Sequence, residues 1–118
     1  MTGRGRAQQP EDLARLFVQR ALEGDAAGLT ELYEPDAVLA YPPGQQTVGR
    51  DAIRAVFSAM LAAAPPFKLE EPLPTLRFAD LALTSTRPAD GTGGRVQVAR
   101  RQPDGSWLRI MDRPEAPR

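Results

Sequence analysis

The acid at the end of the last apolar segment is the strongest candidate for chemistry in this sequence. The strand-like run WLRIM, residues 107–111, leads directly into Asp112. A carboxylate that ends an apolar strand can hydrogen-bond a ligand in an apolar pocket, or it can move a proton as a general acid or base. In the alternative, structural interpretation, Asp112 pairs with Arg113 or caps a turn before Pro114. We take Asp112 as the candidate catalytic group.

The chain offers few other reactive groups. It contains no histidine and no cysteine, which excludes thiol nucleophiles, Ser-His-Asp triads and the usual zinc sites. Schiff-base chemistry would rest on Lys68, the single lysine. Glu70 and Glu71 are adjacent on a predicted strand, so they point to opposite faces and cannot act as an acid and base couple. We therefore expect no metal site and no cofactor.

The composition is that of one globular domain. The chain has 118 residues, of which 42% are hydrophobic and 25% charged, and its formal net charge is zero. Without a basic stripe, we expect no nucleic-acid partner. The longest apolar stretch, near 59–64, is far shorter than the ~20 residues that span a bilayer, so we expect no membrane association. Residues 1–10 lack the apolar core of a signal peptide. They are expected to form a flexible tail on a cytoplasmic domain of residues 11–115.

The first half of the chain predicts three helices. Residues 10–23 carry apolar side chains at helical spacing and stop at Gly24. Asp25 can cap a second helix that includes Tyr33 and must end before Pro35. A short strand, DAVLAYPPG, follows. The segment 49–64 is helical again, and Pro65 and Pro66 end it; its apolar stripe is Ile53, Val56, Phe57, Met60 and Leu61.

The second half predicts an antiparallel meander, with strands near 67–71, 75–86, 95–101 and 106–112. The sequence QPDG predicts a type I turn with a bulge, because Gly105 accepts a positive φ. Glycines in the sequence ADGTGG, residues 89–94, lack the setting of a phosphate-binding loop. Helices followed by a meander predict the α+β class. We expect three N-terminal helices on the concave face of a curved, mostly antiparallel sheet, which together enclose an internal pocket.

Alternation along the last strand assigns its two faces. If Leu108 and Ile110 face the pocket, Asp112 lies with them, and Trp107, Arg109 and Met111 point outwards. An outward Trp and Met predict a homodimer through the outer face of the sheet.

The register of the last hairpin stays open at this level. One register places Val96 and Val98 on the inner face beside Asp112, whereas a slip of one residue places Arg95 and Gln97 there.

The stretches LEGDAAGLTELYEPDAVLAYPPG…TVGRDAIRAVF, DLALTST and VARRQPDGSWLRIMDRP resemble the SnoaL-like and ketosteroid-isomerase-like superfamily. The resemblance covers residues 11–115 and implies the cone-shaped α+β fold of the nuclear transport factor type. That superfamily contains isomerases, cyclases, dehydratases, hydrolases and binding domains, so the resemblance implies a fold rather than an activity.

The resemblance carries few functional residues over to this chain. Phe17 stands where the steroid isomerases have an oxyanion-hole tyrosine, and Tyr41 stands where they have the catalytic acid. The second oxyanion donor falls near Gln97, an amide that can still donate a hydrogen bond. SnoaL-type cyclases place an acid late in the chain inside the cavity, the region of Asp112.

We therefore expect the domain to bind a small, largely apolar molecule in an internal pocket. The alternative is an enzyme of the isomerase, cyclase or hydratase type that uses Asp112 as a general acid or base. The expected ligand-binding side chains are those of Tyr41, Phe17, Val56, Phe57, Met60, Gln97, Leu108 and Ile110.

Overall fold

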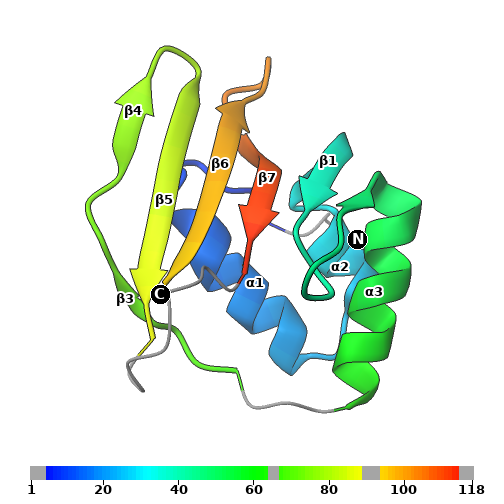
Figure 1. The fold of residues 1–118 in the computed structure, drawn as a ribbon. Coiled ribbons are helices and arrows are strands. Elements are labelled where there is room, and N and C mark those ends of the chain that lie inside the picture. The colour runs from blue at the N-terminus through cyan, green and yellow to red at the C-terminus, as the bar shows by residue number, and fades with distance from the viewer. Residues whose placement is uncertain (1–4, 64–66, 89–93, 115–118) are drawn as a thin grey trace.

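Helices and strands occupy separate layers in the computed structural model, which describes residues 5–63, 67–88 and 94–114 (Figure 1). Three helices in these residues lie on one side of a curved, unclosed sheet. The elements in chain order are α1 (Asp12–Leu22), α2 (Ala26–Thr30), β1 (Tyr33–Leu39), β2 (Thr47–Val48), α3 (Arg50–Ala62), β3 (Glu71–Pro72), β4 (Leu76–Phe78), β5 (Leu81–Arg87), β6 (Arg95–Arg101) and β7 (Trp107–Arg113).

The sheet has the strand order β2-β1-β7-β6-β5-β3, and β4 pairs separately with β5. Its ladders are antiparallel except for the β1–β7 pair, which is parallel. The predicted α+β class and the mostly antiparallel sheet are confirmed. The parallel pair places the first strand of the chain directly beside the last one.

Local signals set the ends of the first two helices. After α1, Gly24 adopts a φ of +69°, a conformation that favours glycine. Asp25 then caps α2, because its Oδ1 accepts a hydrogen bond from the Gly28 N–H at 2.8 Å. The predicted helix was too long, however, since α2 ends at Thr30 and Tyr33 begins β1. The extended chain before Pro35 pairs with β7 instead of continuing a helix.

Two hairpins of the second half, β6–β7 and β4–β5, differ in how well the sequence predicts them. The QPDG turn is confirmed: Gly105 has a φ of +87°, and the Gln102 N–H donates to the Ser106 carbonyl at 2.7 Å. The single strand predicted at 75–86 is wrong. It is split into β4 and β5 by a tight turn in which Ala79 adopts a φ of +52°. In the segment 67–71, only Glu71 is in a strand, β3.

The N-terminal segment is part of the fold from Ala7 onwards. The Ala7 side chain is buried, and its carbonyl accepts a hydrogen bond from the Trp107 N–H at 3.0 Å. Pro10 is fully buried as well. Ala7 and Pro10 therefore pack within the fold, and Ala7 contacts the start of the last strand, although both lie in the segment for which the sequence predicts a flexible tail.

A β-bulge in β7 changes the predicted faces of that strand. Val98 pairs with Met111 and Ala99 pairs with Arg109, so the register passes over Ile110. Before the bulge, Trp107 and Arg109 point inwards and are 6% and 4% exposed, contrary to the prediction. Leu108 pairs with the exposed Arg100, and Ile110 has no partner. These two residues therefore do not share the inner face with Asp112.

Beyond the bulge, Asp112 points inwards and Met111 points outwards, as predicted. Asp112 is only 6% exposed, whereas Met111 is 52% exposed. Gln97 pairs with Asp112 and is buried, so the hairpin adopts the slipped register, and Val96 and Val98 lie on the other face.

Trp107 is not on the outer face of the sheet, but other apolar side chains are exposed there. Leu76 and Phe78 of β4 pair with outward residues of β5, and they are 64% and 79% exposed. Together with Met111 they give this face exposed apolar side chains. Burial of Trp107 removes half of the pair on which the homodimer was predicted, and the homodimer stays a prediction. No helix in the described ranges is long and apolar enough to cross a membrane.

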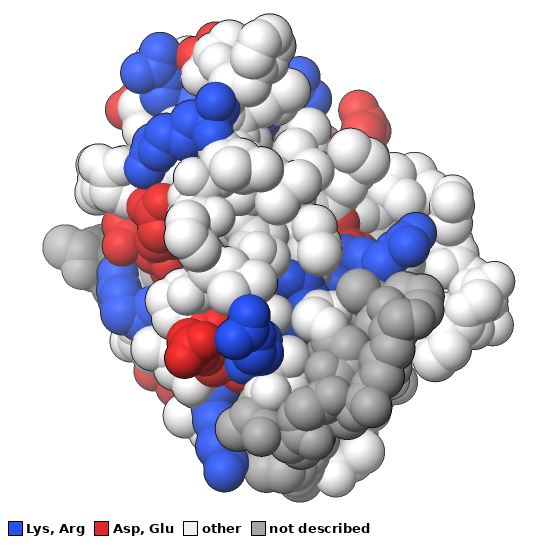
Figure 2. Space-filling model, turned by 60° about the vertical axis from the view of Figure 1, so that its left-hand side comes forward, with Lys and Arg blue, Asp and Glu red and all other residues white. Residues whose placement is uncertain are grey.

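Charged side chains of both signs are interspersed on the surface (Figure 2). Among the exposed ion pairs, Arg101 contacts Asp80 at 3.0 Å and Arg77 contacts Glu11 at 3.3 Å. Such solvated pairs contribute little to stability. Other charged side chains, those of Arg20, Arg109 and Asp112, are buried inside the fold.

Candidate functional site

Paired residues form three rows across the inner face of the sheet. Two of these rows run from β5 to β1, and the third joins β5 and β6. The first row is Ala82, Ala99, Arg109 and Tyr33; the second is Thr84, Gln97, Asp112 and Leu39; the third is Thr86 and Arg95. Residues paired across strands share a face, so these side chains all point towards the helices. Polar and charged groups therefore enter the interior in neighbouring rows.

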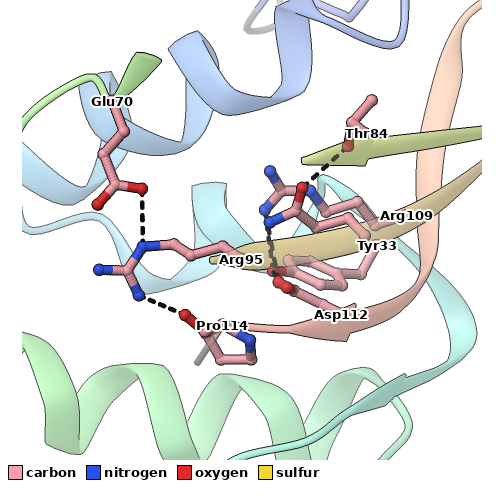
Figure 3. Close-up of polar contacts among 8 residues, drawn as sticks. Tyr33, Glu70, Thr84, Arg95, Arg109, Asp112 and Pro114 are labelled. Carbon is pink, nitrogen blue, oxygen red and sulfur yellow. Dashed lines mark hydrogen bonds and ion pairs between the residues drawn. The ribbon is translucent and has the colours of Figure 1, made fainter. Parts of the chain in front are cut away.

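Tyr33, Arg109 and Asp112 form a buried polar triad in the first two rows (Figure 3). Their exposed fractions are 0%, 4% and 6%. The Tyr33 hydroxyl donates a hydrogen bond to Oδ2 of Asp112. The Arg109 Nη1 lies 3.3 Å from that hydroxyl and 3.5 Å from the same carboxylate oxygen. The three groups thus meet around Oδ2 of Asp112.

The bulge at Ile110 brings two of these groups together. In a regular strand, residues three apart point to opposite faces. Because the register passes over Ile110, Arg109 and Asp112 both point inwards and form an ion pair. Bulges re-aim side chains in this way near functional sites in many proteins. Tyr33 joins from β1, where it is the direct partner of Arg109.

Aromatic rings surround the guanidinium of Arg109. It lies 5.3 Å from the ring centroid of Phe17 and 5.8 Å from that of Tyr33, within range of cation–π attraction. The ring of Phe57 in α3 packs against both Phe17 and Tyr33, with centroid separations of 5.6 Å. Phe67 contacts Phe17 from the segment after α3. Aromatic rings therefore cover the Arg109 and Tyr33 side of the triad.

Burial affects the pKa values of two triad residues, Tyr33 and Arg109. Removal from water raises the pKa of the Tyr33 phenol well above its ordinary value, and the neighbouring Asp112 carboxylate raises it further. Burial also opposes the charge of Arg109, yet the pKa of its guanidinium is raised because Tyr33 and Asp112 lie beside it. The phenol stays protonated near neutral pH and the guanidinium stays charged.

Two polar atoms of the triad have no hydrogen-bond partner in the described part of the chain. They are Nε of Arg109 and Oδ1 of Asp112, and both are buried. A buried donor or acceptor without a partner costs roughly 1–3 kcal/mol. The triad therefore presents one unused N–H donor and one unused carboxylate acceptor.

The second row extends the polar surface beyond the triad. The Thr84 hydroxyl donates to Oε1 of Gln97 at 2.9 Å, which orients the Gln97 amide. Gln97 is the cross-strand partner of Asp112 and is 6% exposed. An amide group thus stands beside the carboxylate on the inner face.

A second ion pair joins the third row to the segment that follows α3 (Figure 3). Oε1 of Glu70 accepts hydrogen bonds from Arg95 Nε and from the Thr86 hydroxyl, both at 2.8 Å. Arg95 also donates to the carbonyl of Pro114. These contacts hold the 67–70 segment against the ends of β5, β6 and β7.

The predicted site residues differ in whether they contact the triad. Gln97 pairs with Asp112, Phe17 stacks on Arg109, and Phe57 contacts Tyr33. Three others, Tyr41, Val56 and Met60, are partly buried against the same core. Leu108 and Ile110 are displaced from the inner face by the bulge.

Sequence reasoning missed Tyr33 and Arg109. For Tyr33 a signal exists, since Pro35 lies two residues later and restricts Glu34 to an extended conformation, which favours an irregular strand over a helix. For Arg109 no local signal exists, because the bulge at Ile110 contains neither glycine nor proline.

No group of three or more His, Cys, Asp or Glu side chains that could hold a metal ion occurs in residues 5–63, 67–88 and 94–114. A separate surface hollow of about 280 Å³ lies between α2 and α3. Its lining includes Arg50, whose Nε donates to the Tyr33 carbonyl at 2.8 Å. That hollow is lined by Ala27, Thr30, Glu31, Arg50, Asp51 and Arg54, so it does not include the triad.

The family model of the SnoaL-like domain matches residues 14–112, which span all three rows of the site. This chain belongs to the SnoaL-like domain family. The match begins within α1 and ends at Asp112. No curated protein shows significant similarity to the sequence.

Solved structures support the same fold at low sequence identity. A candidate calcium/calmodulin-dependent protein kinase type II association domain from Thiobacillus denitrificans has a TM-score of 0.73 and 19% identity, over 96% of this chain and 100% of that one. A ketosteroid isomerase-like protein from Erwinia carotovora has a TM-score of 0.67 and 20% identity, over 87% and 89%. A candidate dehydratase of the NTF2-like family from Streptomyces avermitilis has a TM-score of 0.66 and 16% identity, over 90% and 92%. At these identities the similarity establishes the fold alone.

Proposed function

We propose that this SnoaL-like domain binds a small, largely apolar molecule between the helices and the inner face of the sheet. The observation that carries this proposal is the pair of buried polar atoms without partners, Oδ1 of Asp112 and Nε of Arg109. A ligand that hydrogen-bonds them recovers the desolvation cost of about 1–3 kcal/mol for each atom. Specific polar contacts within apolar walls are typical of small-molecule sites.

The surroundings of the triad support an apolar ligand body. Phe17 and Phe57 cover the triad from α1 and α3. Val56, Met60 and Tyr41 are packed against the same core and would extend this apolar lining. A ligand of this kind would place its hydrocarbon part against the helices and its polar group against the sheet.

An enzyme of the isomerase, cyclase or hydratase type is the second candidate. It is favoured by the orientation of the Asp112 carboxylate: Oδ2 is held by Tyr33 and Arg109, while Oδ1 has no partner. An oriented carboxylate of this kind can accept a proton from a bound substrate. The names of two proteins with the same fold, a ketosteroid isomerase-like protein and a candidate dehydratase, refer to chemistry of this class.

The binding proposal can be tested by NMR titration with three hydrocarbons, toluene, indane and 2-methylnaphthalene, and three alcohols, benzyl alcohol, 2-indanol and 2-naphthalenemethanol. We expect saturable shifts of the Arg109 side-chain N–H and of the Phe17 and Phe57 rings. Asp112→Asn should weaken alcohol binding, whereas the exposed Asp36→Asn serves as the matched control. If no probe shifts these interior resonances, the proposal is wrong.

A further inference from the structure

The inference below rests on the proposed function and concerns the polar group of the ligand. We infer that the triad selects a neutral ligand whose polar group is a hydroxyl, and that it disfavours carboxylate and ammonium ligands. Three independent features of the described residues lead to this conclusion: the charge balance, the hydrogen-bonding capacity and the rigidity of the triad.

The first feature is the charge balance of the interior. Arg109 and Asp112 carry opposite charges, and they form an ion pair at 3.5 Å with 5% and 4% of their side chains exposed. The neighbouring pair, Arg95 and Glu70, is also balanced, at 2.8 Å. A ligand with a net charge would therefore enter a region whose charges are already compensated. Burying an ion without a counter-ion is strongly unfavourable.

The second feature is the hydrogen-bonding capacity that the triad leaves unused. Oδ1 of Asp112 can only accept a hydrogen bond, and Nε–H of Arg109 can only donate one. A hydroxyl group both donates and accepts, so its hydrogen-bonding capacity matches that of the two unused atoms. A carboxylate would repel Oδ1, because both are acceptors, and an ammonium would leave Nε–H unpaired and repel the guanidinium.

The third feature is that neither side chain is free to reorient. Oδ2 of Asp112 is held by the Tyr33 hydroxyl and by Arg109. The guanidinium of Arg109 lies near the rings of Phe17 and Tyr33. A charged ligand therefore cannot recruit one partner by swinging the other away. Fixed polar groups reject a mismatched ligand more strongly than flexible ones.

The test compares matched ligands of one size at pH 7. Benzyl alcohol, benzoate and benzylamine, and the corresponding 2-naphthyl series, are titrated into the wild-type protein and followed by NMR. We expect each alcohol to bind on the order of 10- to 100-fold more tightly than its carboxylate and its amine, the effect of one hydrogen bond to a charged group. Asp112→Asn leaves the charge of Arg109 uncompensated, so it should invert the order in favour of the carboxylate. Asp36→Asn should keep the wild-type order.

The possible results separate this inference from the proposed function. Equal or tighter binding of benzoate or benzylamine to the wild type overturns the inference, while interior binding itself still supports the proposed function. An unchanged order in a folded Asp112→Asn protein also overturns the inference. If Asp112→Asn does not fold, the wild-type order alone decides. If no member of either series reaches the interior, the proposed function is wrong.

Discussion

Replacing Tyr33 with phenylalanine tests whether the triad is a real, buried hydrogen-bonded unit. The change removes only the hydroxyl that donates to Asp112 and keeps the ring that packs on Phe57. Oδ2 of Asp112 would keep only the Arg109 contact, at the marginal distance of 3.5 Å. A buried hydrogen bond to a charged group contributes about 1.5–3 kcal/mol, so we expect Tyr33→Phe to lower the free energy of unfolding by about 2 kcal/mol.

This loss translates into a measurable change in melting temperature. An unfolding entropy of about 2.1 cal/mol/K per residue gives about 0.25 kcal/mol/K for a chain of this length. A loss of about 2 kcal/mol then lowers the melting temperature by about 8 °C. The fluorescence of Trp107, the single tryptophan, reports unfolding because its side chain is buried in the native protein.

The same substitution predicts an effect of alkaline pH. The pKa of Tyr33 is raised in the folded protein, mainly by burial and then by Asp112, above its ordinary value of 10.0. A raised pKa means that the folded state binds the proton more tightly than the unfolded state. The stabilisation is therefore complete below pH ~10 and is lost as the pH rises further. The difference in stability between wild type and Tyr33→Phe should consequently shrink above pH ~10.

Urea denaturation from pH 7 to pH 11 measures both effects. Tyr41→Phe is the matched control, since Tyr41 is the other tyrosine of the chain and is only partly buried. A loss below about 0.5 kcal/mol for Tyr33→Phe, the range of ordinary surface substitutions, would refute the role of the hydroxyl. A difference that stays constant from neutral to alkaline pH would refute the pKa argument.

Two further predictions concern acid stability and isomerase chemistry. Burial alone would raise the pKa of Glu34, but hydrogen bonds from Arg100 at 2.9 Å and Gln102 at 2.7 Å lower it. The stabilisation that the ionised Glu34 provides is therefore present above pH ~4.5 and is lost as the pH falls. Glu34→Gln should flatten the acid limb of the stability profile, and an unchanged limb in acid denaturation would contradict this. We also expect no Δ5-3-ketosteroid isomerase activity of useful size, because Phe17 and Tyr41 replace an oxyanion donor and a general base. Each of these groups contributes on the order of 10²–10⁴-fold to the rate. Rapid turnover in a steroid assay would show that other residues supply both roles.

The helices and the last hairpin could be predicted because each depends on residues close together in the chain. Gly24 ends α1, Asp25 caps α2, and Gly105 closes the turn before β7, and each acts through its own backbone or side chain. The inward position of Asp112 was also predicted, although by an argument that placed Leu108 on the same face.

The rest of the site depends on pairing between distant strands, which a sequence specifies only weakly. The inward position of Arg109 follows from the register of β7 against β6, which passes over Ile110. Tyr33 enters the site because β1 pairs in parallel with β7, a contact between segments 76 residues apart. The alternation of residues along one strand does not predict the register of β7 against β6 or the pairing of β1 with β7. Burial of Trp107 likewise depends on Ala7, at the other end of the chain.

A strand that carries one extra residue changes the spacing at which equivalent groups occur in related chains. Here the two inward charged residues of β7 are three positions apart, because Ile110 lies between them without a partner. A relative with a regular strand would carry the same two groups two positions apart. An ungapped alignment would then set Asp112 against an outward residue of that relative. Homologues that seem to lack the late acid should therefore be aligned with a one-residue gap at Ile110 before their sites are considered different.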